Sequence, residues 1–304
     1  MKIYSVGAED NGKRIDIVLS KALDLPRAEI QRWIKNGNVE LNRRKAIPHS
    51  LVSERDVISY SPESAKKKEE PVIHPLRVLY EDEHVLVVSK PAGLLVHAIN
   101  EHENSPTLVD SVKAYFPEIV SVGENALRPG IVHRLDKDVS GVMVIAKTNE
   151  AFNDLKRQFS NREIKKEYIA LAYGTLPKDH DIISLKIARS RSRKRMVARP
   201  ESQEGKEAVT EYDVIKKFKI ATLVRVRIHT GRTHQIRAHF KGIDHPLVGD
   251  VIYAKKHMRH IKPIPFHRIF LHSALLSFTL LDGTYKTVEA PTPDELTELL
   301  EMLR

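Results

Sequence analysis

Cysteine is absent from this chain of 304 residues. Its absence excludes disulfide bonds, thiolate nucleophiles and metal centres with cysteine ligands, and it predicts a cytoplasmic location. No apolar run approaches the roughly 20 residues that a membrane-spanning helix needs, and the N-terminus lacks the apolar core of a secretory signal. There is no glycine-rich phosphate loop, and the 15 histidines lack the spacing of zinc ligands. We therefore expect no metal, no cofactor and no membrane contact.

Positive charge is concentrated in one part of the sequence. The net charge is +10, and residues 186–237 alone hold 15 Lys and Arg against 5 Asp and Glu. The rest of the chain is therefore close to neutral. Such a local excess predicts one surface that binds a polyanion. The alternative is a solvated basic face without a partner.

Residues 1–60 have the pattern of a small α/β domain. Apolar residues at helical spacing predict one helix over 14–23 and a second that starts at Pro26 and ends at Asn36. Short strands are predicted around 39–41 and 57–58. Residues 61–75 are polar and lack periodicity, which indicates a linker. The alternative is a long surface loop inside a single domain.

Strands dominate the predicted structure of residues 76–304. Apolar runs at 85–89 and 142–146 and the alternation over 222–228 are typical of strands. Helices are predicted at 149–159, 235–241 and 293–303. Because strands and helices do not alternate regularly, we expect an α+β fold. Its sheet should be mixed and largely antiparallel rather than doubly wound.

A charged segment directly before one of these strands has the pattern of a reaction site. Five ionisable groups occupy the six positions from His133 to Asp138, and Gly130 and Gly141 flank them. Charged residues on a loop that a rigid sheet holds in place are typical of catalysis. An exposed charged turn with local ion pairs is the alternative.

The sequence resembles the Rlu family of pseudouridine synthases, which modify ribosomal and transfer RNA. The family's signature resembles His133-Arg134-Leu135-Asp136-Lys137-Asp138 with Ser140-Gly141. The other matching blocks follow in the family's order: Lys90-Pro91-Ala92-Gly93 with Val96-His97, Lys166-Glu167-Tyr168-Ile169-Ala170-Leu171, Gly205-Lys206-Glu207-Ala208-Val209-Thr210, Thr230-Gly231-Arg232-Thr233-His234-Gln235-Ile236-Arg237, and His245-Pro246-Leu247-Val248-Gly249-Asp250. Two positions depart from the pattern, since the family usually has threonine at Val139 and glycine at Ala254.

The resemblance implies an isomerase that converts uridine to pseudouridine without a cofactor, with Asp136 as the catalytic aspartate. Asp136 would either attack the sugar or base covalently or take a proton from the ribose, and the sequence leaves both routes open. Burial favours a neutral carboxylic acid, so an ionised Asp136 needs a cationic partner. The resemblance assigns that part to Arg237, for which a phosphate contact is the alternative.

Two further roles follow from the same resemblance. Tyr168 would stack on the base and manage the proton at carbon 5, with core packing as the alternative. Arg134 would fill the gap that the target nucleotide leaves when it swings out. A structural ion pair between Arg134 and Asp138 is the competing interpretation.

The remaining predicted contacts are with RNA. A basic loop over 189–195, which includes Arg193 and Arg195, should add affinity that depends on salt and not on sequence. The N-terminal domain resembles the RNA-binding fold first known from a small-subunit ribosomal protein, and its second helix presents a basic face. The expected substrate-binding residues are His133, Arg134, Arg232, His234, Gln235, Arg225, Arg227, Arg193 and Arg195, and those of the N-terminal domain are Arg27, Gln31, Arg32 and Lys35.

The expected partner is RNA, bound by a monomer. Family members with this N-terminal module mostly act on large-subunit ribosomal RNA, which is the expected substrate, and transfer RNA is the alternative. Two other classes of protein stay open. One is a catalytically silent RNA-binding factor of ribosome assembly, and the other is a hydrolase that uses His133 and Asp136. Isomerisation leaves the mass of RNA unchanged, whereas hydrolysis does not.

Overall fold

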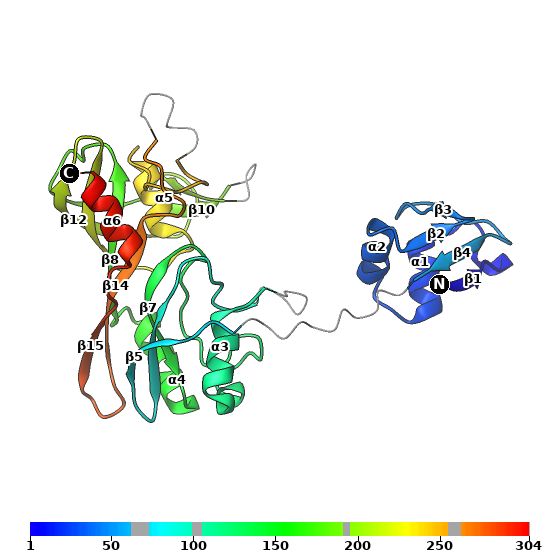
Figure 1. The fold of residues 1–304 in the computed structure, drawn as a ribbon, viewed down its shortest axis with the longest axis horizontal. Coiled ribbons are helices and arrows are strands. Elements are labelled where there is room, and N and C mark those ends of the chain that lie inside the picture. Colours follow the sequence, from blue (N-terminus) through cyan, green and yellow to red (C-terminus); the bar gives the residue numbers. More distant parts are fainter. Residues whose placement is uncertain (62–72, 99–104, 191–194, 255–262, 304) are drawn as a thin grey trace. The chain divides into compact units, whose positions relative to one another are not determined.

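The computed structural model describes residues 1–61, 73–98, 105–190, 195–254 and 263–303. The chain divides into two compact units, Met1–Glu70 and Pro71–Arg304, both drawn in Figure 1. Most of the predicted linker at 61–75 lies outside the described residues, so the predicted domain boundaries stay a prediction.

The first unit is a small antiparallel sheet with two helices. The strand order is β1-β4-β2-β3, and every neighbouring pair runs antiparallel. Both predicted helices form, and the second begins at Arg27, one residue after the predicted start at Pro26. Eleven buried apolar residues, among them Ile15 and Trp33, form the core of this unit. Its elements are β1 (Lys2–Ser5), η1 (Ala8–Asp10), α1 (Ile15–Leu23), α2 (Arg27–Lys35), β2 (Val39–Leu41), β3 (Arg44–Lys45) and β4 (Val57–Tyr60).

The second unit is built on a nine-stranded sheet. Its strands are β5 (Arg77–Glu81), β6 (Val85–Lys90), β7 (Ser140–Ala146), β8 (Lys165–Tyr173), β9 (His180–Ser184), β12 (Val209–Lys217), β13 (Ala221–Ile228), β14 (Leu271–Thr279) and β15 (Tyr285–Glu289). The order is β5-β6-β7-β14-β8-β13-β12-β9, and β15 pairs with β14. Among these described strands, β7 and β14 pair in parallel and the other pairs are antiparallel. The predicted α+β class with a mixed, largely antiparallel sheet is confirmed.

Helices and one hairpin complete the second unit. The helix α4 contacts β7, and α5 contacts β11 and β12; Figure 1 shows α3 next to α4. Every helix in the described ranges is too short or too polar to cross a membrane. The elements are α3 (Leu108–Tyr115), η2 (Pro117–Ser121), α4 (Asn149–Ser160), β10 (Lys186–Arg189), β11 (Met196–Arg199), α5 (Gln235–Gly242) and α6 (Asp294–Met302).

The parallel junction between β7 and β14 fixes the start of β7, where the charged loop ends. Gly141 lies opposite Ser273 in this pairing. A Cβ atom at Gly141 would lie 2.2 Å from the carbonyl oxygen of Ser273, and the backbone has a φ of +125° there. Glycine is therefore required at this position. The close pairing holds the loop at the edge where β7 begins.

Candidate active site

A cavity of about 410 Å³ lies beside the loop that precedes β7. Three elements contribute the residues that the sequence predicts to react: Asp136 comes from this loop, Tyr168 from β8 and Arg237 from α5. The charged side chains in its wall are five cations and a single carboxylate, namely Arg134, Arg162, Lys166, Arg232, Arg237 and Asp136. Such a wall favours an anionic ligand.

The Asp136 carboxylate is held by an arginine that a second carboxylate fixes in turn. Arg237 Nη1 donates to Asp136 Oδ2 at 3.0 Å. Arg237 Nε and Nη2 donate to Asp250 Oδ2 and Oδ1 at 2.8 and 3.0 Å. Burial by itself disfavours the charged guanidinium, but the two carboxylates raise the pKa of Arg237 above its ordinary value. Arg237 is therefore a permanent cation with one N–H group aimed at Asp136.

The loop that carries Asp136 is anchored through its backbone. The buried Lys90 ammonium donates to the carbonyl oxygens of Pro91, Leu94 and Lys137 at 2.8, 2.8 and 3.0 Å. The Gly93 N–H donates to the same Lys137 carbonyl at 2.9 Å. The position next to Asp136 is thus tied to the turn after β6. This anchoring does not use the side chain at Val139, where the family's threonine is missing.

Tyr168 lies on the floor of the cavity. Its ring is 7% exposed, and its strand pairs with Val226 on one side and Ser273 on the other. Burial raises the pKa of Tyr168 to about 12, with a contribution from Asp136 in the same direction and an opposing hydrogen bond to Ser273. At neutral pH the phenol therefore keeps its proton. It can donate a hydrogen bond or pass a proton on, but it is not a standing base.

His133 is engaged with the protein rather than free to act as a base. The N–H of Val144 donates to His133 Nε2 at 3.0 Å, and the ring stacks on Phe159 at 4.6 Å. Because Nε2 accepts a hydrogen bond, the proton of the neutral ring must be on Nδ1. Burial and the nearby Lys166 lower the pKa of His133 to about 3. A hydrolase that relies on His133 and Asp136 is not supported by this geometry.

His234 is the second histidine of the cavity and lies next to Asp136. His234 Nε2 is 3.6 Å from Asp136 Oδ2, and His234 Nδ1 is 3.2 Å from the Tyr253 hydroxyl. Its backbone has a φ of +54°, in the left-handed region that most non-glycine residues avoid and that histidine adopts more often than most. Burial lowers the pKa of His234, while Asp136 opposes that change.

The other predicted contact residues of the cavity are Gln235 and Arg232, which bind neighbouring protein groups, and Arg134, which is exposed. The amide of Gln235 is saturated, because it contacts Thr230, Val209, Thr210 and the N–H of Arg232. It therefore shapes the turn before α5. Arg232 donates to the carbonyl of Glu207 at 3.1 Å. Arg134 is exposed at the cavity, and no ion pair with Asp138 occurs among the described residues.

Arg225 and Arg227 are placed away from the cavity. Side chains alternate along β13, so these arginines lie on the opposite face of the sheet from Tyr168, which pairs with Val226. Arg227 binds Glu211 and Asp213 and is 3.4 Å from Glu167. Arg225 is 3.5 Å from Glu167. The structure does not bring them together with Asp136, and their charge is balanced locally.

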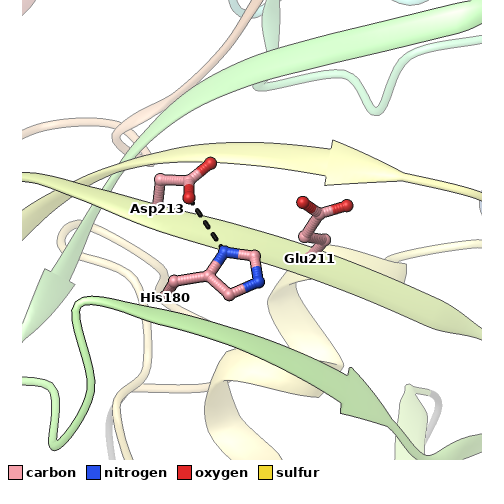
Figure 2. A group of neighbouring side chains, drawn as sticks. All are labelled: His180, Glu211 and Asp213. Carbon is pink, nitrogen blue, oxygen red and sulfur yellow. Dashed lines mark hydrogen bonds and ion pairs between the residues drawn. The ribbon is translucent and has the colours of Figure 1, made fainter.

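The same face carries a group with the composition of a metal site. Figure 2 shows His180, Glu211 and Asp213, whose ligand atoms lie within 4.8 Å of one another. His180 Nδ1 is 2.9 Å from Asp213 Oδ1. Both carboxylates also bind the Arg227 guanidinium, and His229 Nε2 is 3.1 Å from Glu211. Because Arg227 already supplies the positive charge, we assign this group to an ion-pair network.

The predicted RNA-binding loop and helix face are described only in part. Arg193 lies outside the described residues. Arg195 Nη1 donates to the Ile252 carbonyl at 3.0 Å, and its guanidinium lies 5.4 Å from the centre of the Tyr253 ring. The ring of Tyr253 also contacts Arg237 at 5.3 Å. Arg195 and Arg237 therefore contact the same ring, that of Tyr253.

In the first unit, half of the predicted helix face is bound to a buried acid. Arg27 Nε and Gln31 Nε2 donate to Asp16 Oδ2 at 2.9 and 2.6 Å. Arg32 is 3.7 Å from Glu29, and Lys35 is exposed. RNA contacts by these four residues stay a prediction.

Sequence reasoning missed the residues that support the site. Asp250 is the last residue of the segment 245–250 that matches the family, but nothing in the sequence predicts that it binds Arg237. Lys90 ends an apolar strand, which is the only local signal for a buried lysine. In both cases the partner is remote in sequence, 13 residues away for Asp250 and 47 for the bond from Lys90 to Lys137.

Comparisons with known proteins give the family of the chain. Residues 84–241 match the family model described as RNA pseudouridylate synthase. The chain is 36% identical over 309 residues to ribosomal large subunit pseudouridine synthase D of Nitrosomonas europaea, covering 96% of this chain and 85% of that protein. It is 42% identical over 265 residues to an uncharacterized RNA pseudouridine synthase of Aquifex aeolicus, covering 84% and 82%.

A solved structure shows the same fold. Human RNA pseudouridylate synthase domain containing 1 superimposes with a TM-score of 0.56 at 27% identity, covering 73% of this chain and 84% of that one. Fold, cavity and relatives together define an enzyme that modifies RNA. The chain belongs to the RNA pseudouridylate synthase family, whose reaction is an isomerisation.

Proposed function

We propose that this chain isomerises uridine to pseudouridine in large-subunit ribosomal RNA, with Asp136 as the reacting group. The observation that carries the proposal is the contact of Asp136 with Arg237 at 3.0 Å in a cavity whose other charged groups are cations. An ionised carboxylate is thereby kept available where an RNA strand would bind. The relatives named ribosomal large subunit pseudouridine synthase D support the choice of RNA.

The roles of the other groups follow from their positions. Tyr168 offers a ring for the base and a neutral phenol near carbon 5. Arg237 offsets the burial of Asp136 and does not itself react. Arg134, exposed at the cavity and without an ion pair to Asp138, is free to enter the RNA stack. Both routes for Asp136, covalent attack and removal of a ribose proton, are compatible with this arrangement.

Asp136→Asn tests the assignment. The product forms when carbon 5 of the base bonds to the ribose and loses its hydrogen, so RNA tritiated at carbon 5 releases tritium with each turnover. We expect the variant to bind RNA and to release tritium at less than about a thousandth of the wild-type rate. Asp138→Asn is the matched control, because Asp138 is an exposed aspartate of the same loop. Turnover by Asp136→Asn above that limit would refute the role of Asp136.

The substrate is tested by offering large-subunit ribosomal RNA, small-subunit ribosomal RNA and transfer RNA side by side. We expect pseudouridine in the first alone. A wild-type chain that binds RNA without releasing tritium from any of them would identify a silent assembly factor instead. Product of unchanged mass separates isomerisation from hydrolysis.

A further inference from the structure

Lys166 is a half-buried cation in the wall of the cavity. Lys166 precedes Tyr168 by two residues on β8, so both side chains lie on the same face of the sheet. The Lys166 ammonium lies over the Phe159 ring, 5.4 Å from its centre. Within the described part of the chain it forms no ion pair with a carboxylate. Burial alone lowers the pKa of Lys166, which agrees with the lack of a nearby acid.

An unpaired, half-buried lysine is costly for the folded protein. Removing an ammonium group from water is unfavourable unless an anion or several acceptors replace the water. The other deep cation of the cavity, Arg237, has both Asp136 and Asp250. Lys166 has a ring and the neutral His133 as neighbours. The missing anion is therefore expected to come from the ligand.

The position of Lys166 indicates which part of the RNA it meets. A second cavity of about 470 Å³ adjoins the first, and both are lined by Phe159, Arg162, Lys166, Ile228 and His229. Lys166 thus stands where the two cavities meet, whereas Tyr168 lines only the first. A strand whose target base enters the first cavity must continue beyond it. With the base inside the first cavity, the part of the RNA that would lie at the border between the two cavities is the sugar–phosphate backbone.

We propose that Lys166 binds the backbone phosphate adjoining the target nucleotide and so fixes the register of the RNA strand while Tyr168 receives the base. This inference rests on the proposed function, because it takes RNA as the ligand. A compact ammonium suits a phosphate as a point charge. Lys166 and Tyr168, two residues apart on β8, would then contact the phosphate and the base of the same stretch of RNA.

The test compares Lys166→Met with a matched lysine. Lys286→Met is the control, because the Lys286 ammonium also lies over an aromatic ring, Tyr80, and lines neither cavity. We expect Lys166→Met to weaken RNA binding about tenfold to a hundredfold. The slope of log affinity against log salt should fall by about 0.7 to 0.9. The single-turnover rate at saturating RNA should stay within about threefold of wild type, and Lys166→Arg should restore the salt slope.

A modified RNA tests the same contact without changing the protein. An uncharged methylphosphonate linkage on one side of the target uridine should weaken binding by wild type as much as Lys166→Met does. It should cost Lys166→Met little more. Additive losses, or unchanged affinity and salt slope in Lys166→Met, would overturn the proposal. A large fall of the saturating rate with normal binding would instead place Lys166 at the base and also reject the phosphate contact.

The two proposals fail in different ways. If wild type forms no pseudouridine, the proposed function is wrong, yet equilibrium binding still reports on Lys166. If wild type is active and Lys166→Met behaves like Lys286→Met, only the phosphate contact is wrong. Should Lys166→Met not fold, Lys166→Gln takes its place in the same comparison with the methylphosphonate RNA.

Discussion

The single positive charge of Arg237 is shared between two carboxylates, those of Asp136 and Asp250. Asp250 takes two of its N–H groups and is itself buried. The Asp250 carboxylate also accepts the N–H groups of Ile252 and Tyr253. Asp136, Asp250 and Arg237 together carry one net negative charge. The negative charge of Asp136 is therefore only partly compensated by Arg237. Asp250 is thus a positioning residue that acts through Arg237.

Asp250→Asn should separate these effects. The substitution removes the negative charge of Asp250, so the positive charge of Arg237 acts on Asp136 alone. A more strongly compensated Asp136 carboxylate is a weaker nucleophile or base. We expect the saturating rate to fall by roughly tenfold or more, with RNA affinity nearly unchanged. The loss should be confined to the saturating rate, whereas a mere loss of packing would also lower the unfolding midpoint.

The control for Asp250→Asn is Asp213→Asn, in which another aspartate that binds an arginine is neutralised on the opposite face of the sheet. Circular dichroism and thermal unfolding establish that both variants are folded. A saturating rate of Asp250→Asn equal to that of Asp213→Asn, or a fall in rate matched by a lower unfolding midpoint, would contradict the electrostatic role.

Tyr168→Phe keeps the ring and removes the hydroxyl. Because the pKa of Tyr168 is raised to about 12, the phenol keeps its own proton at neutral pH. Its oxygen can therefore take up the hydrogen of carbon 5 only while it passes that proton on to a neighbouring group or to water. We expect the variant to bind RNA normally and to release little or no product, since the hydrogen at carbon 5 must still leave. The measurement is tritium release against RNA binding for the same preparation. Normal turnover would reduce Tyr168 to a platform for the base.

The sequence predicts which residues gather at the cavity better than it predicts their partners, and the roles of these residues stay a prediction. Asp136, Tyr168 and Arg237 were named from motifs, and the structure places all three at one cavity. Arg225 and Arg227 were named from charge, and carboxylates on neighbouring strands neutralise them. A cross-strand partner depends on register, which a single strand does not encode.

At the scale of elements, apolar spacing and proline in the sequence were enough to predict most of the helices. Helices α1, α2, α4, α5 and α6 form where apolar spacing and proline predicted them. Strands β6, β7 and β13 also match their apolar runs or alternation. The short strands β10 and β15 had no comparable signal, because each is stabilised by a single neighbouring strand. Their existence depends on pairing rather than on their own residues.

The junction of α1 and α2 is fixed by a buried aspartate, which allows a test at this scale. Burial opposes the ionised form of Asp16, but hydrogen bonds from Arg14, Gln31 and Arg27 prevail and lower its pKa from 3.8 to about 2. This difference corresponds to about 2 kcal/mol of folding free energy. A lowered pKa stabilises the fold above pH 3.8, and the stabilisation is lost as the pH falls through 2.

Asp16→Asn should therefore destabilise the first unit by about 2 kcal/mol near neutral pH. The difference from wild type should shrink as the pH falls from 3.8 toward 2. The single tryptophan of the chain, Trp33, is buried in this unit, so its fluorescence in denaturant reports on this unit alone. Asp24→Asn is the control, because Asp24 is exposed and left-handed, a conformation that asparagine tolerates. Equal unfolding midpoints for the two variants would show that Asp16 stabilises nothing.

At the scale of the whole molecule, the chain holds two units with separate cores. The first unit buries its own apolar cluster around Ile15, Ile30 and Trp33. The second buries a larger cluster on the nine-stranded sheet. Asp136, Tyr168 and Arg237 all belong to the second unit. If the first unit influences the reaction, it should do so by binding the same RNA or by supporting the cavity.

Removal of the first unit distinguishes these two possibilities. Tethering a second, weak binding site raises its effective concentration and adds affinity without new chemistry. A chain shortened to begin at Glu69 should therefore bind RNA more weakly and with a flatter salt dependence. Each lost phosphate contact should reduce the log–log slope by about 0.7 to 0.9. Saturating RNA should restore much of the turnover, because the cavity remains assembled.

Single-turnover kinetics over a salt series provide the measurement, with circular dichroism to establish that the shortened chain is folded. Matched variants of the full chain, Arg32→Gln and Lys35→Gln, remove charge from α2 and leave the bonds to Asp16 intact. If the first unit holds RNA through this helix, they should account for part of the lost affinity and slope. A folded shortened chain with the affinity and slope of wild type would show that the first unit does not hold the substrate. One that cannot react even at saturation would show that the first unit helps to build the active site, because the chemistry would then depend on a contact between the units rather than on the RNA they share.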